Sequence, residues 1–269
     1  MKSVAAIQMA SGPNIDANLN EAARSINAAA KAGAELVVLP ENFALMANNE
    51  IDNVKNAEQD GKGKIQDFLA EQAAKNNIWI VGGTIPILAE SGQKIRAACL
   101  VYNNSGERVV RYDKIHLFDV ELVDSNEHYT ESKTVEPGDE VVVFDSPFGK
   151  IGIAICYDLR FPELFRAMLD KGAEIFVVPS AFTAITGRAH WEVIVRARAI
   201  ENLSFVIAAA QGGYHVSGRE THGQTMIVDP WGNVLDSLPQ GSGFVLAKID
   251  HERLASTRRN FPAIEHRKL

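Results

Sequence analysis

Hydrophobic and polar positions repeat with two different periods along this chain, and the alternation predicts helices and strands that follow one another almost from end to end. Apolar residues recur at helical spacing over 15–31, 64–76, 162–171 and 190–202. Short, almost wholly apolar runs at 36–39 and 175–178 are typical of strands that are covered on both faces. Further strands are expected at 4–9, 79–86, 95–102, 108–112, 141–144, 151–155, 204–209, 225–228, 234–238 and 243–249. The pattern indicates an α/β protein.

One segment of the chain is echoed by another. Residues 32–41 match residues 171–180, and each copy follows an Ala- and Leu-rich helix and ends a buried strand with proline and a polar residue. The echo favours two pseudo-equivalent halves, with paired sheets between outer helix layers, although two strand–helix units can also resemble each other by chance. No Pro-, Gly- or Ser-rich linker separates the halves, so we expect a single domain over 1–269.

Composition narrows the class of protein. Hydrophobic residues make up 46% and charged residues 23%, the formal net charge is −7, and no Lys/Arg run is dense enough to bind nucleic acid. No apolar run approaches the roughly 18 residues that span a bilayer, so no membrane partner is expected. Residues 1–10 vaguely resemble a signal peptide, but Gln8 interrupts the apolar stretch and a first strand is the better interpretation. Two cysteines form no disulfide framework, which suits a reducing cytoplasm.

Three chemically versatile side chains come just after predicted strands: Glu41, Lys114 and Cys156. Ligands of open α/β sheets bind at this edge, and a carboxylate, an ammonium and a thiol together can act as base, oxyanion stabiliser and nucleophile. A following helix N-terminus would favour the thiolate of Cys156. Each residue also has an ordinary alternative: a cap or loop residue, a surface charge, or a small buried side chain such as Cys99.

The sequence segments around these three residues resemble the motifs of a known family. Leu39-Pro-Glu-Asn-Phe43, Tyr112-Asp-Lys-Ile-His-Leu117 and Cys156-Tyr-Asp-Leu-Arg-Phe-Pro-Glu163 resemble the three signature segments of the nitrilase superfamily of carbon–nitrogen hydrolases, in the same order and at similar intervals. The resemblance runs from about residue 5 to residue 232. It implies a four-layer αββα sandwich that assembles into homodimers or larger homo-oligomers, with residues of about 255–269 as a possible interface tail.

The resemblance also implies roles. Glu41 would be the proton acceptor, Cys156 the nucleophile, and Lys114 with the backbone N–H of Tyr157 the oxyanion donors. The thiolate would attack a carboxamide carbon and form a thioester, which water would then hydrolyse. No metal or cofactor is required by this chemistry, and the seven histidines show no metal-ligand spacing.

A second glutamate belongs to the family's site. Tyr129-Thr-Glu-Ser132 is similar to its segment, so the resemblance assigns Glu131 to orienting Lys114 and the substrate nitrogen. The sequence alone would not choose Glu131 over Glu127 or Glu121.

Residues 180–202 resemble the branch of deaminated glutathione amidases. Such enzymes cleave the amide of a glutathione whose amino group has become a keto group, and they release α-ketoglutarate and cysteinylglycine. The ω-amidase branch, which acts on α-ketoglutaramate, shares much of this stretch. A nitrilase, an N-carbamoyl hydrolase and a non-catalytic interaction protein are further alternatives. The residues at 180–202 argue against the first two. The presence of Glu41, Lys114 and Cys156 together argues against the third.

Both keto-acid substrates carry a carboxylate, so an anion-binding group is expected near the thiol. Arg160 is the first candidate, because an arginine fork suits a carboxylate. Thr186 and Arg188, in the loop expected before the 190–202 helix, come next. Arg160 could instead pair locally with Asp158 or Glu163.

Overall fold

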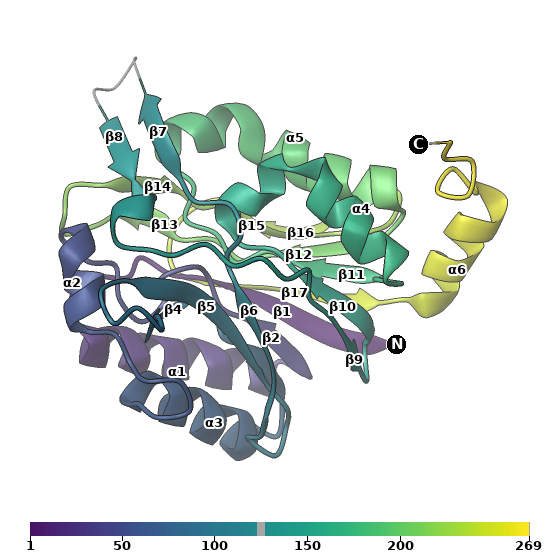
Figure 1. The fold of residues 1–269 in the computed structure, drawn as a ribbon. Coiled ribbons are helices and arrows are strands. Elements are labelled where there is room, and N and C mark those ends of the chain that lie inside the picture. Colours follow the sequence, from purple (N-terminus) through teal and green to yellow (C-terminus); the bar gives the residue numbers. More distant parts are fainter. Residues whose placement is uncertain (123–126, 269) are drawn as a thin grey trace.

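The computed structural model describes residues 1–122 and 127–268, which form two β-sheets packed face to face between two layers of helices (Figure 1). The first sheet has the order β17-β1-β2-β3-β5-β4, with β6 paired to β5. The second has the order β16-β15-β12-β11-β10-β9. The strands of the first sheet are β1 (Lys2–Gln8), β2 (Leu36–Val38), β3 (Trp79–Val81), β4 (Ile85–Leu88), β5 (Ile95–Tyr102), β6 (Arg108–Asp113) and β17 (Gly243–Ile249). Those of the second are β9 (Val143–Ser146), β10 (Gly149–Ile153), β11 (Ile175–Val177), β12 (Phe205–Ala208), β15 (Thr225–Val228) and β16 (Val234–Leu238).

Each sheet is covered on its outer face by a pair of helices. α1 (Ile15–Lys31) and α3 (Lys64–Asn76) pack on the first sheet, and α4 (Pro162–Asp170) and α5 (Ala184–Asn202) pack on the second. The helical spacing of apolar residues explains the packing, because α1 buries Leu19, Ala22, Ile26 and Ala29 along one face. The predicted four-layer αββα sandwich is confirmed.

The echo in the sequence corresponds to an echo in the fold. β1, β2 and β3 are parallel and linked through α1 and α3, and β10, β11 and β12 are parallel and linked through α4 and α5. The two echoing runs form β2 and β11, the middle strand of each parallel trio. The two pseudo-equivalent halves are therefore present in the structure.

Strand direction explains why Glu41 and Lys114 meet. β5 is antiparallel to β3, and β6 is antiparallel to β5, so β6 runs in the same direction as β2 and β3. The residues that follow β2 and β6 therefore emerge at the same edge of the sheet, as the sequence predicted.

The expected strand over 79–86 is two strands, β3 and β4, separated by Gly82-Gly83. Gly83 has φ +57°, and a Cβ there would lie 2.1 Å from the carbonyl oxygen of Pro40. Only glycine allows the backbone to approach the residue before Glu41 so closely. This turn supports the segment that carries the glutamate.

The expected 190–202 helix begins earlier, at Ala184, because Thr183 caps it and accepts a hydrogen bond from the Thr186 N–H at 3.3 Å. Thr186 and Arg188 therefore lie in the first turns of α5 rather than in a loop.

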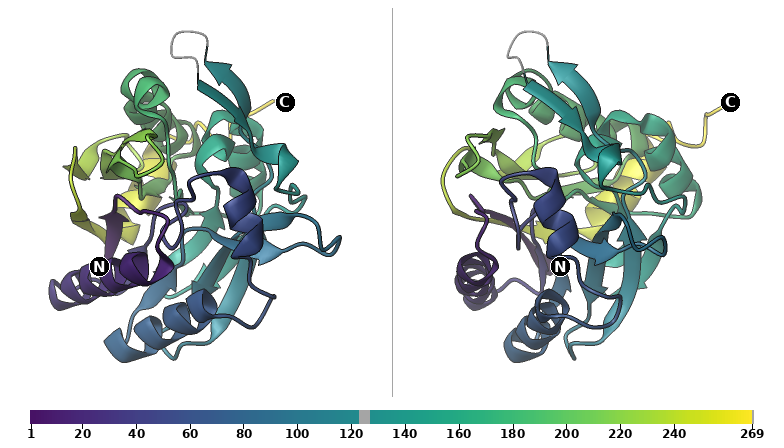
Figure 2. Two further views of the ribbon diagram at one scale, coloured as in Figure 1. Left: turned by 90° about the vertical axis from the view of Figure 1, so that its left-hand side faces the viewer. Right: turned by 60° about the vertical axis from the view of Figure 1, so that its left-hand side comes forward.

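Several short elements have no clear sequence pattern and were not predicted. They are α2 (Glu50–Lys55), β7 (Asp119–Leu122), β8 (Glu127–Thr130), β13 (Gly212–Tyr214), β14 (Glu220–His222) and α6 (His251–Asn260). All but α6 gather around one end of the sandwich, and both termini lie at the other end (Figures 1 and 2). Within the described residues, no helix is long and apolar enough to cross a membrane.

Residues 255–260 of the expected interface tail belong to α6. Beyond it, Arg267 donates from Nη1 to Asp170 Oδ1 of α4 at 2.7 Å. A role of this tail at a subunit interface stays a prediction.

Candidate active site

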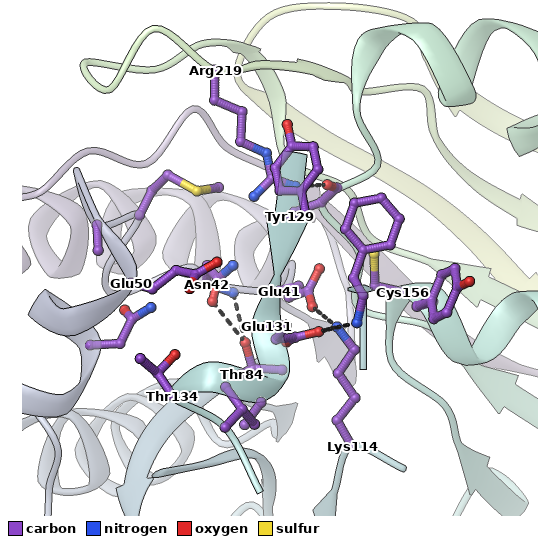
Figure 3. A pocket seen from close by; sticks show the side chains of 18 of the residues that line it. Glu41, Asn42, Glu50, Thr84, Lys114, Tyr129, Glu131, Thr134, Cys156 and Arg219 are labelled. Carbon is purple, nitrogen blue, oxygen red and sulfur yellow. Dashed lines mark hydrogen bonds and ion pairs between the residues drawn. The ribbon is translucent and has the colours of Figure 1, made fainter. Parts of the chain in front are cut away.

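A cavity of about 330 Å³ opens between the two halves at the end of the sandwich where the unpredicted hairpins lie (Figure 3). Its lining includes seven of the eight candidate residues, with α2, β8 and the loop of the β13–β14 hairpin forming walls. The seven are Glu41, Lys114, Glu131, Cys156, Tyr157, Arg160 and Thr186. Arg188 is exposed on α5 and does not line the cavity, so the structure does not bring it to the other candidates.

Lys114 lies between two carboxylates. Its Nζ donates to Glu41 Oε1 at 2.8 Å and to both oxygens of Glu131 at 2.9 and 3.1 Å. The side chain is only 2% exposed. Burial opposes the ammonium, but the charges of Glu131 and Glu41 outweigh it and hold the pKa of Lys114 well above its usual value. The lysine is therefore a fixed positive charge in the cavity.

Glu131 begins a single 3-10 turn after β8, and its carboxylate is held on two sides. The Phe118 backbone N–H donates to Oε2 at 2.7 Å, and Lys114 donates to both oxygens. Burial raises the pKa of Glu131, Lys114 opposes this, and the charge of Glu41 adds to it. Glu127 instead accepts from the Tyr129 hydroxyl, and Glu121 is exposed, so only Glu131 of the three alternatives reaches the lysine.

Cys156 has an unusual backbone conformation for a residue with a side chain. It follows β10 with φ +48°, in the left-handed region that non-glycine residues rarely occupy. Its own N–H donates to Pro179 O at 2.9 Å and helps to hold this turn. Strained backbone of this kind persists where the surroundings impose it and is concentrated at functional sites.

The surroundings of Cys156 favour the neutral thiol. Burial, followed by the Glu41 carboxylate, raises its pKa well above the usual value, and Lys114 and the Ala181 N–H act in the opposite direction without compensating. The expectation that a helix N-terminus would favour the thiolate relied on a helix directly after Cys156, and no α-helix begins there. The thiol is followed by a 3-10 turn over Cys156–Arg160, and α4 starts only at Pro162.

A buried carboxylate ties the lysine segment to the cysteine turn. Asp158 is fully buried and accepts from the Tyr112 hydroxyl at 2.7 Å, the His116 N–H at 3.0 Å and the Ile155 N–H at 2.8 Å. The His116 ring contacts the same carboxylate through Nδ1 at 2.7 Å. Because Tyr112 and His116 flank Lys114, this network fixes the lysine relative to the thiol.

Asp158 is consequently not the partner of Arg160. The Arg160 guanidinium carbon lies 5.9 Å from the Tyr157 ring centre and 5.1 Å from that of Phe182, and Nη1 lies 3.2 Å from His190 Nδ1. Within the described part of the chain, it forms no ion pair with a carboxylate. Its charge is available to an anionic ligand.

Tyr157 contributes both a ring and a backbone N–H. The ring packs edge-on against Phe118 and Phe161, at centre distances of 5.1 and 5.4 Å. The N–H lies at the start of the 3-10 turn, where no preceding helical carbonyl accepts it. An N–H in this position can donate to an oxyanion.

The sequence did not indicate several lining residues, among them Asn42, Thr84, Tyr129 and Arg219. Thr84 accepts from the Asn42 N–H at 2.8 Å and so fixes the residue after Glu41. These residues lie in turns and short hairpins, where no periodic pattern marks them. Among the residues described, no three or more His, Cys, Asp or Glu side chains gather as a metal site.

Comparison with known proteins agrees with this geometry. The carbon–nitrogen hydrolase family profile matches residues 3–259. The chain is 42% identical over 264 residues to the deaminated glutathione amidase of Yersinia enterocolitica, covering 98% of this chain and 92% of that protein. It is 40% identical over 269 residues to the human deaminated glutathione amidase, covering 98% and 82%.

Two solved structures share the whole fold. Caenorhabditis elegans NitFhit matches with a TM-score of 0.93 and 34% identity, over 99% of this chain and 65% of that one. Saccharomyces cerevisiae Nit3, a member of branch 10 of the nitrilase superfamily, matches with a TM-score of 0.90 and 33% identity, over 100% and 97%. The chain belongs to the carbon–nitrogen hydrolase family, within the nitrilase superfamily.

Proposed function

We propose that this protein is a cysteine-dependent amidase that hydrolyses deaminated glutathione to α-ketoglutarate and cysteinylglycine, without a metal or cofactor. The observation that carries the proposal is the cavity in which a buried thiol, a lysine and two glutamates converge. Relatives of about 40% identity that bear the name deaminated glutathione amidase support the choice of substrate.

In the first step, Glu41 removes the proton of Cys156 and the thiolate attacks the amide carbon. The raised pKa of the thiol means that a base is needed, and the Glu41 carboxylate is the negative neighbour that acts on this sulfur. The developing oxyanion is stabilised by Lys114 Nζ and the Tyr157 N–H. Glu131 holds Lys114 through two hydrogen bonds, so the ammonium is in place before the substrate arrives.

In the second step, Glu41 returns the proton to the amide nitrogen, the C–N bond breaks, and cysteinylglycine leaves. The acyl group stays on Cys156 as a thioester. Glu41 then deprotonates a water, which attacks the thioester carbon, and α-ketoglutarate is released with the thiol regenerated.

Arg160 is proposed to bind the carboxylate of the keto acid, and Thr186 is proposed to contribute to this binding from the lining of the same cavity. A guanidinium that pairs with no carboxylate of the described residues, four residues after the nucleophile, can form the bidentate contact that a carboxylate prefers. Arg188 is not included, because its side chain is exposed outside the cavity lining.

A substrate panel tests the proposal. We expect kcat/KM for deaminated glutathione to exceed that for α-ketoglutaramate by at least about tenfold, because only the former fills the leaving-group side of the cavity. Coupled assays of α-ketoglutarate release would measure both, with Cys156→Ala protein as the blank. Equal or reversed rates would instead indicate an ω-amidase, and hydrolysis of nitriles or N-carbamoyl amino acids alone would exclude an amidase.

We further infer a reducing compartment such as the cytoplasm, because Cys99 and Cys156 are both buried free thiols.

We also propose that the protein forms a homodimer or larger homo-oligomer through α5. Val193 is 69% exposed, Ile200 lies seven residues further on the same helix face, and the adjacent Trp231 packs edge-to-face against Phe261 with ring centres 5.5 Å apart. A second copy of this surface would bury these apolar side chains.

Light scattering should therefore give at least twice the 29.4 kDa mass of one chain. Ile200→Glu is expected to shift the protein towards monomer, whereas Val216→Glu, at a 76% exposed position on the β13–β14 hairpin, should not. A monomeric wild-type protein would contradict the proposal.

A further inference from the structure

We propose that Arg219 forms a second carboxylate site in the cavity, which binds the C-terminal carboxylate of the leaving dipeptide. The inference rests on the proposed function and extends it, since it assigns a group of this chain to the leaving side of the substrate. Arg219 lies directly before β14 and lines the same cavity as Cys156 and Lys114. In Figure 3 its side chain extends to the ring of Tyr129, with the proposed catalytic residues below that ring.

The guanidinium of Arg219 is held by a carbonyl and a ring, and no carboxylate among the described residues pairs with it. Nη2 donates to Ala181 O at 2.5 Å, and the guanidinium carbon lies 5.3 Å from the Tyr129 ring centre. Nε is buried and has no hydrogen-bond partner among the described residues. A buried N–H without an acceptor is costly, and a ligand oxygen beside it would remove that cost. The ring and the Ala181 carbonyl orient the planar fork in advance.

The two arginines that line the cavity match the two carboxylates of the proposed substrate. Lys114 pairs with Glu41 and Glu131, and Glu50 adds a third carboxylate to the lining, whereas Arg160 and Arg219 form no ion pair with any carboxylate of the described chain. Deaminated glutathione carries two carboxylates, one on the keto acid and one on the terminal glycine, on opposite sides of the scissile amide. Arg160 is on the turn of the nucleophile and suits the acyl side. Arg219 comes from a separate hairpin and suits the leaving side.

This arrangement gives a physical reason for substrate choice. α-Ketoglutaramate has the first carboxylate but lacks the second, so it gains nothing from Arg219. Binding energy from this remote contact is then available only to the longer substrate, where it can favour the transition state.

Arg219 could alternatively act only through Ala181, whose backbone N–H points to the sulfur of Cys156. Such a positioning role would affect every substrate to the same extent. The carboxylate site predicts an effect on one substrate alone, and the difference can be measured.

The experiment crosses three substrates with matched variants. The substrates are deaminated glutathione, the same molecule with its terminal carboxylate converted to an amide, and α-ketoglutaramate. On the wild-type protein, we expect amidation to lower kcat/KM by about 10- to 100-fold, the size of a lost charged hydrogen-bond pair. Arg219→Met should show the same loss on deaminated glutathione, mainly in KM. The Arg219→Met protein should show no loss of kcat/KM on α-ketoglutaramate. Its kcat/KM should be the same for deaminated glutathione and for the form with the amidated terminus.

Two further variants complete the comparison. Arg160→Met is expected to lose activity on all three substrates, because each carries the keto-acid carboxylate. Arg219→Lys should retain part of the preference, since it keeps the charge but not the fork. The amidated substrate needs no variant, so the test holds even if Arg219→Met fails to fold.

Equal losses of Arg219→Met on all three substrates would overturn the proposal in favour of positioning through Ala181. Wild-type rates that are indifferent to amidation would also overturn it. If wild-type protein hydrolyses α-ketoglutaramate but not deaminated glutathione, the proposed function itself fails, a result that the other two outcomes do not produce.

Discussion

Cys156→Ala is expected to lower kcat by at least about 10⁴-fold and to leave the fold intact. The thiol forms the bond to the acyl group, so its loss removes the whole covalent pathway, and nucleophile deletions in comparable sites cost up to about 10⁶-fold. The fold should tolerate the change, because alanine at φ +48° has the same backbone strain as cysteine and loses only a sulfur at the cavity wall. Steady-state assays and thermal unfolding would measure the two effects.

Cys99→Ala is the matched control. Cys99 is fully buried in β5, does not line the cavity, and burial alone raises the pKa of its thiol. We expect full activity with a stability loss of about 1 kcal/mol from the lost packing. If Cys156→Ala retained activity within tenfold of wild type, or Cys99→Ala abolished it, the proposed nucleophile would be the wrong one.

Glu41→Gln is expected to lower kcat by about 10²- to 10⁴-fold while it makes the thiol of Cys156 more acidic. The first effect is the loss of the general base. The second follows from the sign of the charges: the Glu41 carboxylate raises the pKa of the thiol, and Lys114 and the Ala181 N–H lower it. With glutamine at position 41 the opposing charge is gone, so the thiolate should appear at lower pH in a less active protein.

The thiolate absorbs in the ultraviolet, so a pH titration of Glu41→Gln against the Glu41→Gln, Cys156→Ala double variant would give the thiol pKa. Glu131→Gln serves as the comparison, because Glu131 is held by Lys114 and the Phe118 N–H and is not one of the main groups that shift the pKa of the thiol. A thiol pKa in Glu41→Gln equal to or higher than that of the wild type would show that the carboxylate does not act on this sulfur.

The long periodic segments were predictable because burial of both faces of a sheet requires regular apolar runs in the strands and apolar stripes in the helices. α1, α3, β5 and β15 have the predicted bounds, since each pairs an apolar stripe or run with a clear end signal. The strand predicted over 79–86 was wrong because the break at Gly83 depends on contact with Pro40, a residue 43 positions earlier. α5 began six residues early because the cap at Thr183 outweighs a weak apolar pattern.

The proposed catalytic groups were predictable for a different reason. Glu41, Lys114 and Cys156 each follow a strand and lie in segments that resemble the signature motifs of the family. Glu131 needed the resemblance, since nothing local distinguishes it from Glu121 and Glu127. In the structure, Glu131 is the one of these three glutamates that accepts hydrogen bonds from Lys114, through both of its oxygens.

By itself, the sequence determined the two strand–helix halves and the sheet edge at which a thiol, an ammonium and a carboxylate emerge, because these follow from local patterns. The four-layer sandwich followed from the family resemblance. Only the tertiary structure decided the environment of the thiol, the partners of Asp158 and which cavity arginines pair with no carboxylate of the described residues. These properties depend on burial and on charges from distant segments, and Arg219 lies 63 residues after Cys156 on a hairpin with no pattern of its own. Folding brings their charges into one low-dielectric cavity, where proximity rather than sequence order sets their chemistry.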